Sequence, residues 1–293
     1  MQLPSLLTSE DLELLRFQAR GLLDSRIRGN SPLSGEQRSR YRGMGMELEE
    51  LRAYQQGDDV RHIAWRTSAR SHLPITKVFR TERQQRALLL VEQHPGMFFA
   101  TTGRLKATCA AHVTALLTFA LLAERGEAGG VVAHQHLHHF GYSSGLDQGL
   151  ALIGSAAAAG QSATAIPART LLTEAQRLCG RGDTLFIISD FSRWDTSLTA
   201  HLLQLGEQRQ LHAIQIIDRG EQNLPAIGKL RLRSPYSGKT AIIDSNNPVL
   251  RQQYSAAMAA QQQQIESLLQ RCGVHHTRLH TDDDLFLTLA RSL

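Results

Sequence analysis

The chain has 293 residues, of which 42% are hydrophobic and 20% are charged. This balance excludes intrinsic disorder, which combines low hydrophobicity with high net charge, and the length is sufficient to bury a sizeable core. A miniprotein held together by disulfides is excluded too, because the three cysteines, Cys109, Cys179 and Cys272, are odd in number and widely separated. We expect them to be buried thiols in a reducing compartment.

Helical and strand-like patterns alternate along most of the chain. A helical spacing over residues 9–23 precedes a Gly-, Ser- and Arg-rich stretch, 26–45, that is typical of an extended connection. Later, short apolar runs that predict strands lie at 86–92, 129–133, 184–189, 212–217 and 275–279. Helical patterns lie at 105–124, 146–159, 168–179, 196–210, 248–271 and from 283 onward.

Strands separated by helices favour a largely parallel sheet that is covered on both faces. We therefore predict an α/β, doubly wound domain over residues 86–293, preceded by an N-terminal helical and extended arm over residues 1–85.

A Gly-Lys-Thr sequence at 238–240 resembles the end of a phosphate-binding loop. The first glycine of such a loop would fall at Arg233, and the residues after Thr240 predict a strand rather than a helix. Strand-like residues 230–233 and 240–243 flank this turn, so a β-hairpin is the better interpretation. We expect any ATP in this system to be hydrolysed by a partner.

The sequence Gly141-Tyr-Ser143-Ser-Gly145 has the pattern of a hydrolase nucleophile. The acids and histidines that follow in hydrolase order are Asp190, Asp218, Asp244, His275, His276 and His280. Against this interpretation, only one clear core strand and its crossover helix precede the serine's strand, and the sequence has no oxyanion segment of the H-G-G-G type. A serine hydrolase using Ser143 is the alternative to a simple loop.

Four histidines, at 134, 136, 138 and 139, lie close together. Alternate histidines share one face of a strand, as some zinc ligands do. The sequence indicates no fourth ligand, so we expect a solvated face on an edge strand.

Basic residues gather between positions 61 and 86, within a chain of net charge +5. No aromatic side chains alternate with them as base-stacking platforms would, so we expect an acidic protein surface rather than nucleic acid as the partner. The N-terminus has no basic and apolar secretory signal. The longest apolar run, 109–123, is shorter than the roughly 20 residues needed to span a bilayer. We expect a cytoplasmic protein without membrane insertion.

The most specific stretch, from Arg42 to Arg70, reads RGMGMELEELRAYQQGDDVRHIAWRTSAR. It closely resembles the signature of the domain of unknown function fifty-eight family. Further matches in order are ISDF at 188–191, the Ile-Asp pair at 217–218, the hairpin at 228–243 and the start of the helix at 250–254.

Members of that family are similar to von Willebrand factor A domains and usually work beside MoxR-type AAA+ ATPases in assembling or activating other proteins. The resemblance thus implies a non-enzymatic adaptor, without a cofactor, that binds such an ATPase and a client protein. Its signature residues are Asp58, Asp59, Arg61, Trp65 and Arg70. We expect the Gly-Asp-Asp turn to pair with the nearby Arg61, Arg66 and Arg70, and Trp65 to anchor a buried cluster. The charged residues either contact a partner or brace the arm against the sheet. The signature's usual Ile-Asp-Trp is Ile63-Ala64-Trp65 here.

In von Willebrand factor A domains a divalent cation sits at the carboxyl ends of the central strands, held by an Asp-x-Ser-x-Ser loop, a threonine and a later aspartate. The corresponding loop here has Glu92, His94 and Gly96, and Asp190 matches the later aspartate. Since oxygen ligands suit magnesium and this loop has lost hydroxyls, we expect no bound metal.

The same loop continues into Met97, Phe98 and Phe99. We expect these apolar side chains to contact the ATPase; the alternative is that Phe98 and Phe99 fold back onto the helix starting near Leu105.

Overall fold

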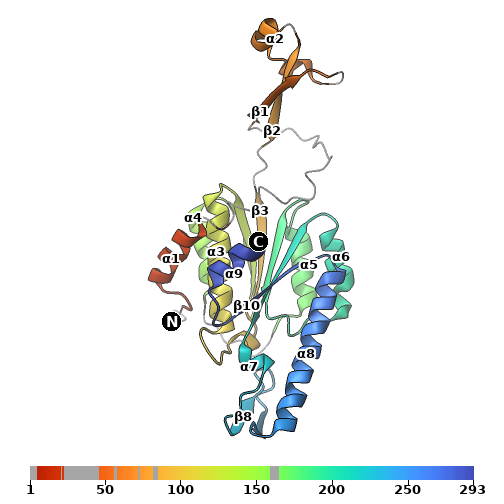
Figure 1. The fold of residues 1–293 in the computed structure, drawn as a ribbon. Helices are drawn as coiled ribbons and strands as arrows, with labels where there is room; N and C mark the ends of the chain where they lie inside the picture. Colours follow the sequence, from red (N-terminus) through yellow and green to blue (C-terminus); the bar gives the residue numbers. More distant parts are fainter. Residues whose placement is uncertain are drawn as a thin grey trace. The chain divides into compact units, whose positions relative to one another are not determined.

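The computed structural model describes residues 5–20, 22, 46–55, 58–71, 73–81, 85–158 and 165–293. The chain divides into two compact units, one of Met1–Asn30 with Gln85–Leu293 and the other of Ser31–Gln84 (Figure 1). The expected extended connection at 26–45 lies outside the described residues.

The larger unit is built on a six-stranded sheet in the order β10-β7-β6-β3-β4-β5. All neighbours are parallel except β5, which runs antiparallel to β4 at one edge. The strands are β3 (Arg86–Glu92), β4 (Glu127–Ala133), β5 (Leu137–Ser143), β6 (Thr184–Ser189), β7 (Gln210–Ile217) and β10 (His275–His280). The mixed α/β architecture with a largely parallel central sheet is confirmed.

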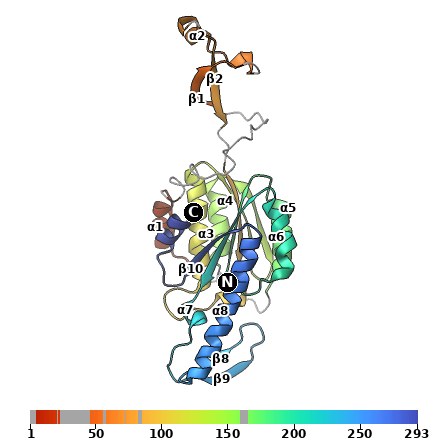
Figure 2. The same cartoon turned by 45° about the vertical axis from the view of Figure 1, so that its right-hand side comes forward.

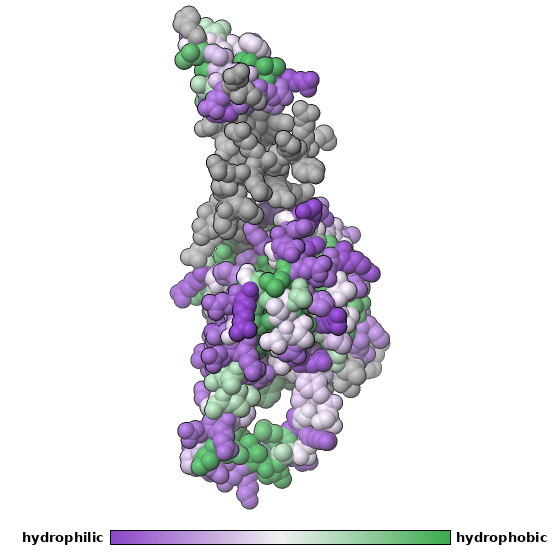
Figure 3. Space-filling view, turned by 90° about the vertical axis from the view of Figure 1, so that its right-hand side faces the viewer, coloured by the Kyte–Doolittle hydropathy of each residue, from purple (hydrophilic) through white to green (hydrophobic). Residues whose placement is uncertain are grey.

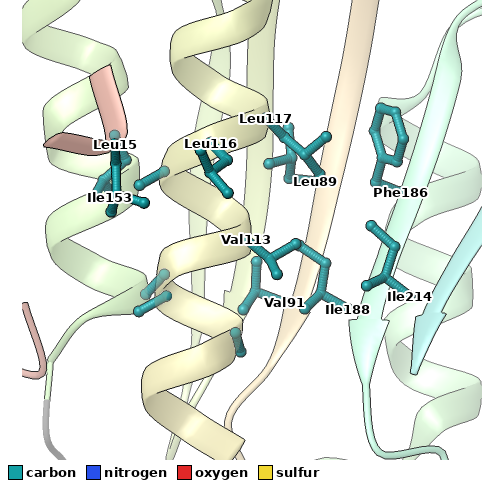
Figure 4. Close-up of a cluster of buried hydrophobic side chains, with 14 of the residues drawn as sticks. Leu15, Leu89, Val91, Val113, Leu116, Leu117, Ile153, Phe186, Ile188 and Ile214 are labelled. Atoms are coloured by element: carbon teal, nitrogen blue, oxygen red, sulfur yellow. The ribbon is translucent and has the colours of Figure 1, made fainter. Parts of the chain in front are cut away.

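The apolar run of β3 explains why this strand lies at the centre. Successive side chains of a strand point to opposite faces of the sheet. Accordingly, Leu89 and Val91 join one buried cluster, whereas Leu88 and Leu90 join the other. Figure 4 shows the first cluster, in which Val113 and Leu117 of a covering helix meet this face of β3.

Helices cover both faces of the sheet (Figures 1 and 2). The first cluster receives side chains from α1 (Ser9–Ala19), α3 (Lys106–Ala123), α4 (Leu146–Ala156) and α9 (Leu285–Ser292). The second receives them from α5 (Ala168–Leu178), α6 (Thr199–Gly206) and α8 (Pro248–Arg271). Burial on both sides is what a parallel sheet requires.

The first helix belongs to the larger unit. Thr8 caps α1, and Leu15 and Ala19 enter the same core cluster as α3. The prediction placed all of residues 1–85 in one N-terminal arm, whereas the structure places Met1–Asn30 in the larger unit. The reason is that the apolar side of α1 is buried in that cluster. α1 also ends at Ala19 instead of Leu23.

By length and composition, α3 could cross a membrane. The apolar run 109–123 counted from the sequence is shorter than this helix and did not indicate it. Within the described residues it is the one helix with this property, and 78% of it is buried inside the protein. A helix that is apolar all round is also what the centre of a large core needs.

A separate hairpin pairs β8 (Lys229–Arg233) with β9 (Thr240–Asp244) in antiparallel register. Gly238 in its turn has a φ of 67°, a conformation that glycine adopts without strain. The hairpin interpretation of the Gly-Lys-Thr sequence is confirmed.

The smaller unit contains a second antiparallel pair, β1 (Met46–Ala53) and β2 (Ile75–Thr81). Between these strands the chain forms a 3₁₀ turn, η2 (Val60–His62), and a short helix, α2 (Trp65–Ser71). The Ser68 hydroxyl accepts a hydrogen bond from the Ile75 backbone N–H at 2.8 Å and donates one to the Ala64 carbonyl at 3.0 Å, which ties α2 to β2.

His212 on β7 makes stability depend on pH. Its ring packs between Phe186 and His275, and burial, followed by the neighbouring His275, lowers its pKa from 6.5 to about 4. His212 in the unfolded chain therefore binds a proton that it does not bind in the folded chain, so stability falls as pH drops from 6.5 to 4.

We expect His212→Phe to flatten this part of the curve of unfolding free energy against pH, measured with urea. The control His136→Phe, in the exposed turn before β5, should leave the slope unchanged; an unchanged slope in His212→Phe would contradict the assignment.

Candidate functional site

The candidate site lies where the strand order reverses. The chain leaves β3 for β4 on one side and later returns to β6 on the other side of β3. In open α/β sheets, ligands bind outside the carboxyl ends of the strands at such a switch point. Glu92 is the last residue of β3, and Asp190 directly follows β6, so both carboxylates lie at this edge.

A buried lysine lies between two acids at this edge. The Nζ of Lys106, the first residue of α3, is 2.8 Å from Oδ2 of Asp190 and 2.5 Å from Oε1 of Glu221. Glu221 belongs to α7 (Arg219–Gln222), which follows β7. A lysine in the first helical turn opposes the helix dipole. The two carboxylates compensate for that cost and for the burial of the ammonium group.

The directions of the pKa shifts favour the charged forms of Lys106 and Asp190. Burial alone would raise the pKa of Asp190, but the Lys106 ammonium and the His94 hydrogen bond outweigh it and hold the pKa well below its ordinary value. Burial alone would lower the pKa of Lys106, but the charges of Asp190 and Glu221 outweigh it and raise the pKa. Burial raises the pKa of Glu221, even though Lys106 opposes that shift.

His94 connects this network to the β8–β9 hairpin. Its Nε2 is 3.0 Å from Oδ1 of Asp190, and its Nδ1 is 2.8 Å from the hydroxyl of Tyr236 in the hairpin turn. Burial would lower the pKa of His94, but the hydrogen bond with Asp190 and the charge of that carboxylate raise it overall. Gly96 is needed here, because a Cβ at that position would lie 2.9 Å from both the Tyr236 hydroxyl and the His94 ring.

Glu92 is held from the other side of the site. Its Oε2 accepts hydrogen bonds from the Ser189 hydroxyl at 2.6 Å and from the Trp194 indole N–H at 3.2 Å. Its Oε1 is buried and has no hydrogen-bond partner within the part of the chain that the structure describes.

These donors do not suit a divalent cation. Magnesium requires about six oxygen ligands in near-octahedral geometry. Both oxygens of Asp190 are already engaged by His94 and Lys106, and the ammonium supplies the positive charge between the acids. In the described ranges, no group of three or more His, Cys, Asp or Glu residues could hold a metal ion.

The structure thus brings together Glu92, His94, Gly96 and Asp190, which the sequence indicated. Sequence reasoning missed Lys106, Glu221 and Tyr236. One signal was available for Lys106, which is the sole Lys, Arg, Asp or Glu in the otherwise apolar stretch 106–123. A lone charge on a buried helix requires a buried partner.

The aromatic end of the loop differs from the expectation. Met97 is fully buried, so it cannot contact a partner in this conformation. Phe98 packs partly against the core cluster, as the alternative predicted, whereas Phe99 is 40% exposed. Only Phe99 offers substantial apolar surface to a partner.

The signature residues of the smaller unit have partners close in sequence. Asp58 accepts hydrogen bonds from the Arg52 guanidinium at 2.7 Å and from the Gln55 backbone N–H at 2.9 Å. Asp59 caps η2 by accepting from the backbone N–H of Arg61. The arginine that pairs with this acidic turn in the described ranges is therefore Arg52, rather than Arg61, Arg66 or Arg70.

Trp65 does not anchor a buried cluster, because it is 69% exposed on α2. Arg61, Arg66 and Arg70 are exposed as well, and none of them forms an ion pair with any residue that the structure describes.

The residues of the hydrolase alternative lie far apart. Ser143 ends β5, whereas His275, His276 and His280 lie on β10, at the opposite edge of the sheet. Five strand spacings separate these edges, roughly 24 Å at about 4.8 Å each. The Ser143 hydroxyl instead accepts the Gly145 backbone N–H at 2.9 Å. Ser143 therefore forms no catalytic triad with any of these three histidines.

The clustered histidines also have local partners. His138 and His139 lie exposed on β5, which is an edge strand as expected. His139 is 3.0 Å from Glu174, while His134 is buried and its Nε2 is 2.7 Å from the Ser155 carbonyl.

Lys106→Met should destabilise the larger unit by about 3–5 kcal/mol, because it leaves two acids without their buried cation. The measurement is the free energy of unfolding in urea. The double variant Lys106→Met/Asp190→Asn should recover part of this loss, since it removes one of the stranded charges. Equal stability of wild type and Lys106→Met would show that the network contributes nothing.

Magnesium should leave the melting temperature unchanged, because His94 and Lys106 already engage both oxygens of Asp190. The comparison is thermal unfolding with magnesium chloride and with sodium chloride at equal ionic strength. A rise specific to magnesium would contradict this view of the site.

Comparisons with known proteins agree with the signature. The family described as protein of unknown function DUF58 matches residues 50–264. The uncharacterized proteins Rv1480 of Mycobacterium tuberculosis and Mb1516 of Mycobacterium bovis are each 26% identical over 279 residues, covering 88% of this chain and 82% of theirs.

Two solved structures are similar at low identity. The conserved hypothetical protein BatB from Bacteroides thetaiotaomicron is 10% identical, covers 71% of this chain and 96% of its own, and has a TM-score of 0.46. An aerotolerance-related membrane protein from Bacteroides fragilis is 13% identical, covers 62% and 99%, and has a TM-score of 0.39. At these TM-scores the likeness decides nothing about fold or function. The family match spans well over half of the chain, and this protein therefore belongs to the DUF58 family of proteins of unknown function.

Proposed function

We propose that this protein is a non-enzymatic, cytoplasmic adaptor of von Willebrand factor A type. Its partners are a MoxR-type AAA+ ATPase and a client protein that the two act on together. The proposal starts from the family resemblance, and three features of the structure support it.

The observation that carries the proposal is the ion network at the switch point. A catalytic or ligand-binding site in an α/β sheet keeps its polar groups available to a substrate. Here the Lys106 ammonium and both Asp190 oxygens are hydrogen-bonded to protein groups, and both side chains are buried. Such a site stabilises the loops around it, and function then depends on the surfaces that those loops present.

The arrangement of the sheet is also compatible with a von Willebrand factor A type. It has an antiparallel edge strand, helices on both faces, and an aspartate directly after β6 that meets the loop after β3. In this interpretation the Lys106 ammonium takes over the charge that a divalent cation provides in related domains.

Exposed aromatic residues supply candidate contacts on each unit. Phe99 lies near the strand-end network of the larger unit, and Trp65 lies on α2 of the smaller unit. Aromatic and arginine side chains dominate the binding energy of protein interfaces. Arg61 and Arg66 flank Trp65 in the sequence, which favours an acidic partner surface.

The test is binding of the full chain to the purified MoxR-type ATPase, measured by calorimetry with and without nucleotide. We expect Trp65→Ala and Phe99→Ala each to weaken binding by about 2 kcal/mol, or roughly thirtyfold, because each removes an exposed aromatic anchor. The control Leu203→Ala removes a comparably exposed apolar side chain from α6 and should leave binding unchanged.

The chain alone should hydrolyse no ATP. If wild type fails to bind the ATPase under every nucleotide condition, the adaptor proposal is wrong. If both aromatic variants bind as wild type does, these two residues are not the contact.

A further inference from the structure

One part of the larger unit extends beyond the sheet and, apart from Tyr236, takes no part in the site described above. It consists of the β8–β9 hairpin and the start of α8, residues 225–251, and is called the projection below (Figure 2). No residue of β8 or β9 is buried, and the buried residues of α8, Ile265, Leu268 and Leu269, all lie in its second half. The projection therefore contributes little to the core.

The projection exposes large apolar side chains, which Figure 3 shows gathered at this end of the molecule. Ile242 is 73% exposed and Ile227 is 66% exposed. Leu232 and Val249 are also exposed. A two-stranded hairpin in water is marginally stable on its own, and such apolar surface on it favours a binding role.

The projection is also strongly basic. Residues 225–251 contain five basic residues (Lys229, Arg231, Arg233, Lys239 and Arg251) and one acid (Asp244), a net charge of +4 within a chain of +5. Of these, Lys229, Arg231, Arg233 and Lys239 are exposed, and none of the four forms an ion pair with a residue that the structure describes. Positive charge at this density selects an acidic partner.

Strand alternation arranges these groups by face. Because residues two apart share a face, Lys229, Arg231 and Arg233 lie on the same side of β8, and Ile242 pairs with Arg231 on that side. The same register places Asp244 opposite Lys229 and Thr240 opposite Arg233 on this face. This face therefore carries three basic residues and one acid around an aliphatic centre, and its charge excess lies at Arg231 and Arg233.

The hairpin also has open edges. In the described part of the chain, β8 and β9 pair only with each other, so each strand has a second edge whose backbone groups are available. Such an edge is a template for another extended chain, and peptide recognition by strand addition uses it in this way.

The turn of the hairpin contacts the strand-end network through Tyr236. The Tyr236 hydroxyl meets His94, and the Arg193 guanidinium lies 5.6 Å from the centre of the Tyr236 ring. This side-chain contact holds the hairpin to the rest of the larger unit, in addition to the chain segments that precede and follow it.

We propose that the projection binds an extended, acidic segment of a partner protein, which adds a strand to the β8–β9 hairpin. The acidic side chains of the segment meet Lys229, Arg231 and Arg233, and its aliphatic side chains cover Ile242. This inference rests on the proposed protein-binding function and adds to it the chemistry of the segment that is bound.

The test uses the full chain and a fluorescent synthetic peptide of alternating Glu and Val, with fluorescence anisotropy as the readout. The paired variant Arg231→Glu/Arg233→Glu should weaken binding at least tenfold, as should Ile242→Asp. The control Arg169→Glu/Arg181→Glu makes the same change of net charge at exposed positions elsewhere and should bind as wild type does. Melting curves establish that each variant is folded.

Two further peptides separate strand addition from charge attraction. An alternating Lys–Val peptide should not bind, and a peptide with the Glu–Val composition but proline at every third position should bind at least tenfold more weakly, because proline cannot complete the strand pairing. On binding of the Glu–Val peptide, hydrogen exchange should slow in β8 or β9. Equal binding of the proline peptide, or unchanged exchange, would overturn strand addition.

Vesicles of phosphatidylserine and phosphatidylcholine provide the remaining comparison. Tight binding to these vesicles that is lost in Arg231→Glu/Arg233→Glu, together with no binding of the Glu–Val peptide, would assign the projection to a membrane surface and overturn the proposal. The peptide assay does not require the ATPase. If the peptide does not bind while the ATPase does, this inference is wrong and the proposed function stands. If the peptide binds and the ATPase does not, the proposed function is wrong and this inference stands.

Discussion

The Lys106 ammonium is the charge on which the structure of the switch-point edge depends. It joins the start of α3 to the loop after β6 and to α7 after β7, through Asp190 and Glu221. The same aspartate orients His94, which in turn meets Tyr236 of the β8–β9 hairpin. Removal of one partner from such a buried network leaves uncompensated charge, so each loop around the switch point depends on the others. A single cation thus organises elements that are separate in sequence.

Much of the architecture could be predicted from the sequence, because it follows from local patterns. The apolar run of β3, buried on both sides, and the helical spacing of α3 specify a covered parallel sheet without reference to other elements. The hairpin turn at Gly238 was recognisable from its residues and their spacing. These features depend on periodicity and turn chemistry, which are encoded within a few residues.

The chemistry at the switch point was only partly predictable. Asp190 and Glu221 lie 84 and 115 positions from Lys106, so their meeting depends on the tertiary fold and not on a local pattern. The exposure of single side chains was equally hard to predict. Met97 is buried and Phe99 is exposed in the same apolar triplet, and Trp65 lies in solvent although tryptophan is more often covered. Family resemblance indicated the signature positions, but it could not say which arginine pairs with Asp58.

The docking of α1 beside α3 has a consequence for synthesis on the ribosome. The smaller unit can pair β1 with β2 as soon as Thr81 has emerged, since both strands lie within 36 residues of each other. α1 packs on α3, so its apolar side is covered only after residues 106–123 have been made. During translation the nascent chain therefore carries an uncovered α1 segment ahead of an unfinished sheet, an interval in which chaperones have access to Leu15 and the rest of that side of the helix.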